Sequence, residues 1–136
     1  MAVWKNPVRA ATTGAITLSN TQTVDGVALV ADDRVLVKNQ ASAPTNGLYK
    51  VVSGGAWTRT TDADAAGEFS YQMVIPVTEG TVNGNTAWQL TTADPDPYIV
   101  GTTDMDFGAY TPALGKFFEF ALVSRVISSN PAYLQS

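Results

Sequence analysis

Short stretches in which apolar and polar residues alternate recur along most of the chain, and turn residues separate them. Residues 15–19 and 34–38 alternate in this way, which is the pattern of strands with one buried face. Asp25-Gly26 and Asn46-Gly47 are turn signals, and Gly54 and Gly55 stand in the connection of a predicted hairpin formed by residues 48–52 and 56–59. Such regular spacing predicts an all-β fold, a compact sandwich or barrel of short antiparallel strands with extended terminal arms.

The second half of the chain continues this pattern. Residues 70–78, 87–91, 98–100 and 105–110 are predicted strands, and residues 61–67 a loop or short helical turn. Pro76 has no backbone N–H, so its strand should lie at an edge or bulge there. No internal repeat and no linker is evident. We therefore expect an N-terminal arm at residues 1–7, one β-domain at 8–112, and a C-terminal apolar strand and arm at 113–136.

Residues 114–127 differ from the rest because they are almost continuously apolar. A period of two gathers their large side chains on one face, whereas a helical period gives a poorer stripe, so we expect a strand that is buried on both faces or pairs with a neighbour. A small monomer rarely exposes so much apolar area, which indicates a contact with another protein. The residues assigned to partner binding are Trp4, Phe117, Phe118, Phe120, Leu122, Val126 and Tyr133.

The chain contains no cysteine and no histidine. This composition excludes disulfides, thiolate metal sites, Cys nucleophiles and the Ser-His-Asp arrangement, and it removes the usual general base. Two carboxylates could act as a glycosidase pair, but spacing in the sequence does not give the separation in space that this chemistry needs. Neither Asp62 with Asp64 nor Asp94 with Asp96 shows the twelve-residue calcium loop. We assign no catalytic residue, no metal ligand and no cofactor, and expect that the protein is not an enzyme.

Charge is scarce and uneven. Charged residues make up 15% of the chain and the net charge is −4, which disfavours nucleic acid as a partner. Residues 60–115 contain acids but no Lys or Arg, which predicts either an acidic face toward a basic neighbour or a set of solvated loops. No signal-peptide run and no stretch of about 20 apolar residues occurs, so we expect a protein without membrane contact that is made and kept in the cytoplasm, or built into a particle there.

Several longer motifs follow one another in a fixed order. They are Val8-Arg9-Ala10-Ala11-Thr12-Thr13, Gln22-Thr23-Val24-Asp25-Gly26-Val27, Asp33-Arg34-Val35-Leu36-Val37-Lys38-Asn39-Gln40, Asn46-Gly47-Leu48-Tyr49, Gly55-Ala56-Trp57-Thr58-Arg59-Thr60-Thr61-Asp62-Ala63-Asp64, Glu79-Gly80-Thr81-Val82-Asn83 and Gly101-Thr102-Thr103.

This series, which spans about residues 8–110, resembles a β-module that recurs in tailed-bacteriophage virion proteins, especially tail fibres and related appendage proteins. The resemblance implies a structural protein of the virion, assembled in the host cytoplasm, that forms a homo-oligomer and attaches to other virion proteins. Its place would be a tail fibre or appendage, the capsid surface, or a joint. Asp32 stands where the family commonly has glycine, and residues 114–136 have no counterpart in it.

The tryptophans leave a second function open. Trp57 and Trp88 lie beside threonines in two predicted strands, where they would either fill the core or stack on a sugar ring. The alternative to an assembly protein is therefore a receptor-binding module that recognises a host surface glycan, with Trp88 as the glycan-binding residue.

Overall fold

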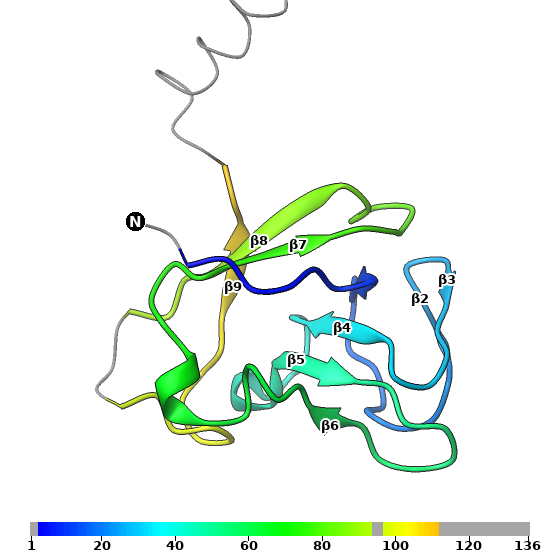
Figure 1. Ribbon diagram of the computed structural model, residues 1–136, viewed down its shortest axis with the longest axis horizontal. Coiled ribbons are helices and arrows are strands. Elements are labelled where there is room, and N and C mark those ends of the chain that lie inside the picture. Colours follow the sequence, from blue (N-terminus) through cyan, green and yellow to red (C-terminus); the bar gives the residue numbers. More distant parts are fainter. Residues whose placement is uncertain (1–2, 94–96, 112–136) are drawn as a thin grey trace, which may run out of the picture.

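The computed structural model describes residues 3–93 and 97–111. Within this part the fold is all-β, as predicted, and its three sheets do not close into a barrel (Figure 1). The larger sheet has the order β1-β4-β5-β6, with β1 (Ala10–Ala11), β4 (Arg34–Val37), β5 (Gly47–Lys50) and β6 (Thr58–Arg59). The other sheets are β2 (Thr23–Val24) with β3 (Val27–Ala28), and β7 (Val74–Val77), β8 (Thr86–Leu90) and β9 (Phe107–Ala109). Two 3-10 turns, η1 (Ala43–Thr45) and η2 (Ala66–Glu68), lie in connections.

Local sequence explains where these strands begin and end. Asp25 and Gly26 both take positive φ values, 50° and 80°, and so form the predicted turn between β2 and β3. β4 and β5 pair antiparallel, as β5 and β6 do. Residues 15–19 and 98–100 do not form the predicted strands, since Ser19 makes only an isolated bridge to Ala56. The predicted strand within residues 114–127 lies outside the described residues.

The N-terminal segment connects the two main sheets. Its first part runs parallel to β7, where the Lys5 N–H donates to the Val74 carbonyl at 2.8 Å. Its second part runs parallel to β4, where the Arg9 N–H donates to the Arg34 carbonyl at 2.8 Å. In Figure 1 this dark blue segment lies between β7 above and β4 below. Residues 3–7, expected as part of an arm, are thus hydrogen-bonded along β7.

Pro76 lies where the N-terminal ladder is interrupted. The segment forms isolated bridges to β7 at Val74 and Val77, on either side of the proline. The N–H groups of Val74 and Thr78 donate to this segment, whereas Pro76 has no N–H to offer. The proline is therefore accommodated at a break in pairing, in agreement with the sequence prediction.

The three-stranded units β4-β5-β6 and β7-β8-β9 follow one hydrogen-bonding plan. Val35 pairs with Tyr49 as Ile75 pairs with Trp88. Each unit begins at a residue with positive φ, and this residue's N–H donates across the hairpin: Asp32 to Val51 and Gln72 to Leu90. The expectation of no internal repeat is therefore wrong for the backbone, although the side chains at matching positions differ.

Two apolar clusters hold the sheets together. One face of the larger sheet packs under residues 16–29, in a cluster that contains Val35, Val37 and Trp57. The opposite face of the same sheet presents Leu36 and Leu48 to the β7-β8-β9 sheet. Because both faces of β4 are covered, Val35, Leu36 and Val37 are all buried rather than alternately exposed.

Candidate docking groove

An open groove with a volume of about 620 Å³ lies across the β7-β8-β9 sheet, mostly on its outer face. Ile75 and Val77 point into the core between the sheets, so alternation along the strand directs Pro76 to the outer face. Ala87 pairs with Pro76 and shares this outer face. The two residues form part of a small apolar floor, over which the larger rings of Trp4 and Tyr110 stand as lining residues.

Trp4 and Tyr110 come from opposite ends of the described chain. Their ring centroids lie 5.4 Å apart at an interplanar angle of 80°, an edge-to-face arrangement that is favourable for aromatic pairs. The two backbone positions are fixed, because Trp4 forms a bridge to Val74 and the Tyr110 N–H donates to the Ala87 carbonyl at 2.9 Å. Trp4 nevertheless remains 55% exposed, so a large aromatic surface is held in place at the groove.

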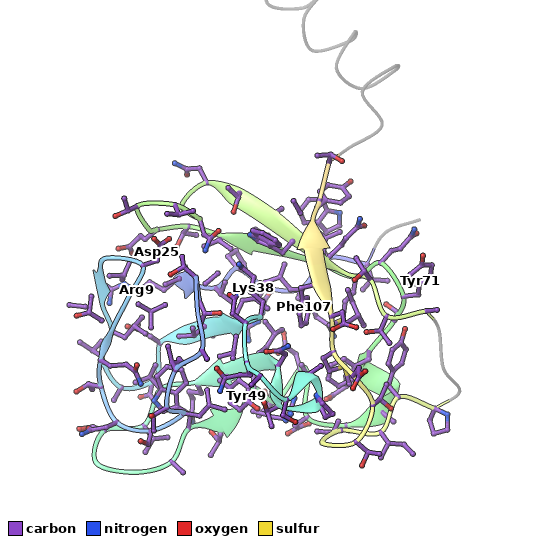
Figure 2. The ribbon with its side chains drawn as sticks, turned by 180° about the vertical axis from the view of Figure 1, so that it is seen from behind. Arg9, Asp25, Lys38, Tyr49, Tyr71 and Phe107 are labelled. Atoms are coloured by element: carbon purple, nitrogen blue, oxygen red, sulfur yellow. The ribbon has the colours of Figure 1, made fainter. Side chains whose placement is uncertain are left out.

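Trp88 lies at the side of the same groove. Its ring packs partly against the core cluster, and its Nε1 donates to Thr86 Oγ1 at 3.0 Å. The ammonium group of Lys38 lies 4.0 Å from the ring centroid, a cation–π contact, and Figure 2 shows Lys38 between β4 and β8. Burial lowers the pKa of Lys38, against the opposing effect of the Asp25 charge. Lys38 therefore occupies a position that a sugar stacked on Trp88 would require.

The two equivalent units differ in what covers their corresponding faces. In the first unit, Leu36, Leu48 and Thr60 are buried against the neighbouring layer. The matching positions in the second unit are held by Pro76 for Leu36, Ala87 for Leu48 and Tyr110 for Thr60. The last match follows from the hydrogen bonds: the Thr60 N–H donates to the Leu48 carbonyl, and the Tyr110 N–H donates to the Ala87 carbonyl. These second-unit residues are only half-buried.

Trp4 extends the same correspondence. Trp4 comes directly before Lys5, whose N–H donates to β7. Val8 comes directly before Arg9, whose N–H donates to β4 in the equivalent way, so Trp4 and Val8 occupy matching positions. Val8 is 1% exposed and belongs to the core between the sheets, whereas Trp4 is among the most exposed large apolar residues of the described part. We call the outer surface made by Trp4, Pro76, Ala87 and Tyr110 the open face. It is the counterpart of a face that the first unit buries.

Two other hollows at the surface are lined by ion-paired side chains and turn residues. Arg9 bonds Asp33 at 2.8 Å and Glu79 at 3.1 Å beside the β2-β3 hairpin, and these hydrogen bonds raise the pKa of Arg9. Figure 2 shows Arg9 and Asp25 together near the tip of this hairpin. Beside β6, Arg34 forms a two-pronged bond to Asp62. These contacts join chain segments and identify no ligand.

The remaining predicted residues have different outcomes. Trp57 is buried in the core, and its Nε1 donates to the Asn20 carbonyl at 2.7 Å, which confirms a structural role. The assigned contact residues of the tail, Phe117, Phe118, Phe120, Leu122, Val126 and Tyr133, lie outside the described residues. Sequence reasoning missed Tyr110 and Ala87 because their importance depends on a sheet register that only the structure provides.

Within residues 3–93 and 97–111, no group of three or more His, Cys, Asp or Glu side chains could hold a metal ion. In the same part of the chain, no helix is long and apolar enough to cross a membrane. Comparison of the chain with protein-family models, curated proteins and solved structures found no match.

Proposed function

We propose that this protein is a structural subunit of a tailed-phage virion that acts by oligomerising and by attaching to neighbouring virion proteins. The observation that carries the proposal is the open face, where a rigid sheet holds Trp4 and Tyr110 at the surface. Aromatic anchors on a fixed scaffold are characteristic of protein interfaces, because they lose little conformational freedom on binding. The ordered motifs of residues 8–110, which resemble a virion β-module, support the phage assignment.

The apolar tail supports the same function. Residues 114–127 begin shortly after Tyr110, so a wall of the groove and a second apolar surface lie close together along the chain. Burying such a segment against a neighbour contributes on the order of several kcal/mol, at about 25 cal/mol per Å² of apolar area. Attachment through the groove and the tail would leave the β-sheets themselves unchanged.

The test is attachment to particles. Antibodies against the full chain should label virions of the phage that encodes it, and tagged protein should sediment with particles that lack their own copy. A chain without residues 114–136 should keep the circular dichroism spectrum of the β-domain but lose this attachment. Full attachment of the shortened chain, or virions free of the protein, would contradict the proposal.

A host surface glycan is the second candidate partner, favoured by the rings of Trp4 and Tyr110 next to the polar side chains of Asn85 and Thr86. Aromatic rings beside amide and hydroxyl groups are suited to sugars. Glycan-array binding that disappears in Trp4→Ala or Tyr110→Ala, with unchanged thermal unfolding, would establish this function. Binding that survives both substitutions would exclude the groove as the glycan site.

A further inference from the structure

We propose that the open face receives residues 114–127 of a second copy of this chain, so that each molecule inserts its apolar tail into the next. The proposal rests on the proposed function, since it names the partner of the same groove. It joins two features that the sequence leaves separate: the exposed aromatic position of Trp4 and the apolar tail.

The equivalence of the two units indicates what should cover the face. In the first unit, the matching positions Leu36 and Leu48 are fully buried, and the layer that covers them is a strand-bearing sheet with Ile75 and Val77. The same backbone plan in the second unit ends in Pro76 and Ala87, which remain half-buried. By analogy with the first unit, we expect the open face to be covered by an apolar, extended segment rather than by a small polar ligand.

The chain itself contains one such segment outside the described residues. Residues 114–127 are almost continuously apolar, and Phe118, Phe120 and Leu122 would share one face in an extended conformation. The described strands that carry comparable apolar runs, β4 and β7, already lie in the core. The tail, residues 114–127, is an apolar run that does not belong to the core formed by the described residues.

The direction of the chain favours a neighbour over the same molecule. β9 leads through Tyr110, which is already bonded as a continuation of the strand, to Thr111 at the end of the sheet (Figure 1). Because Pro112 follows, Thr111 is restricted to an extended conformation. The described chain therefore keeps the direction of β9 up to Thr111, and in the sequence the apolar run starts two positions after Pro112, which leaves little length for a reversal over its own groove.

Such an exchange is heterologous, because the tail and the groove are different surfaces of one chain. Repeated tail-to-groove contacts give a closed ring if the rotation between copies closes, and a filament if it does not. Each molecule in a ring would have its own open face covered.

Complementation between two full-length variants tests the exchange. Ala87→Glu places a carboxylate on the groove floor and leaves the tail intact, whereas Leu122→Glu places one in the tail and leaves the groove intact. Each variant alone is expected to run at the monomer mass of 14.4 kDa, while the wild type assembles. An equimolar mixture retains one functional tail and one functional groove, so it should form a heterodimer. Ala31→Glu, at an exposed turn away from the groove, is the matched control and should assemble like the wild type.

Trypsin gives a second readout, because Lys116 and Arg125 are the tryptic sites that follow Arg59 in the chain. Both sites should be protected in assembled wild type, cut in Ala87→Glu, and increasingly cut as the wild type is diluted. Protection that does not change on dilution, in a protein of monomer mass, would show that the tail covers its own molecule and would overturn the proposal. If Ala87→Glu does not fold, Tyr110→Ala replaces it, with the same expected loss of assembly.

A mixture that stays monomeric would also overturn the exchange. If Ala87→Glu still assembles and still attaches to virions, the exchange fails but the proposed virion function stands. If the protein is absent from virions while the two variants complement each other, the exchange stands and the virion function fails.

Discussion

The carboxylate of Asp25 accepts the backbone N–H of Asn83 at 2.7 Å, and so joins two turns that lie far apart in the sequence. The same carboxylate accepts the N–H of Val82 at 2.9 Å, and the Thr81 N–H donates to the Asp25 carbonyl at 3.0 Å. The tip of the β2-β3 hairpin is thus bonded to the connection between β7 and β8. The predicted turn residue is also a tertiary contact that links the two halves of the fold.

Asp25→Ala should lower the free energy of unfolding by about 1.5–3 kcal/mol, because hydrogen bonds to a charged acceptor contribute about that much. Asp25→Asn should have a smaller effect, since asparagine retains an acceptor oxygen and tolerates the positive φ of this turn. Urea unfolding at pH 7 measures both values. Equal effects of the two substitutions would show that the carboxylate charge contributes nothing.

Asn83 should be among the least replaceable polar residues of the described part. Its side chain is 2% exposed, and Nδ2 donates to the carbonyls of Ala11 and Thr12, both at 3.2 Å. Asn83→Ala leaves these carbonyls without that donor, which should cost about 1–3 kcal/mol in the free energy of unfolding. Asn6→Ala, at an exposed position, is the control and should cost clearly less in the same urea titration.

Matching positions of the two units should respond differently to the same substitution. Leu36→Ala removes a fully buried side chain and should cost about 2–5 kcal/mol. Pro76→Ala, at the matching position on the open face, should change stability by about 1 kcal/mol or less, the range usual away from the core. Chemical denaturation of both variants measures the two losses. A larger loss of unfolding free energy for Pro76→Ala than for Leu36→Ala would contradict the assignment of a buried face to the first unit and an open face to the second.

The Arg34–Asp62 pair should make stability depend on pH. Partial burial acts to raise the pKa of Asp62, but hydrogen bonds from Arg34 and its charge outweigh this and hold the pKa below its usual value. A carboxyl with a lowered folded pKa stabilises the fold above its unfolded pKa of about 4, and this stabilisation disappears as the pH falls through the folded pKa.

Asp62→Asn should therefore lower the free energy of unfolding at pH 7, by about 1 kcal/mol or less because the pair is partly solvated. The difference between wild type and variant should shrink as the pH is lowered below about 4, the unfolded pKa of the carboxyl. Urea titrations at pH 7 and at acid pH measure it. A difference independent of pH would show that the substitution acts through packing and not through the lost charge.

Local signals in the sequence predicted the elements whose cause is local. The Asp25-Gly26 turn, the β4 strand and the β5-β6 hairpin follow from residues that are neighbours along the chain. Residues 15–19 alternate as a strand would, but they do not form one. Ile16 and Leu18 still pack against the apolar cluster on the larger sheet, although their backbone takes no place in a sheet ladder. Periodicity reports which side chains face the core, and it does not report which backbone groups find a partner.

The groove could be predicted only in part. Trp4 was identified from its type and position, and it is indeed exposed. Pro76, Ala87 and Tyr110 join it because of sheet register, and register depends on pairings between residues far apart in sequence. The repeated plan of the two units was hidden for the same reason, since Leu36 and Pro76, or Leu48 and Ala87, share a hydrogen-bonding position without sharing a side chain.

The position of the N-terminal segment between the two sheets also has a consequence for the order of events during synthesis. Residues 3–12 leave the ribosome before their partners in β4 and β7 are made. The β4-β5 and β7-β8 hairpins can form from nearby residues, whereas the segment that joins them must wait for both. Such long-range pairing slows folding, so the nascent chain carries Trp4 and Val8 uncovered until β7 has been made.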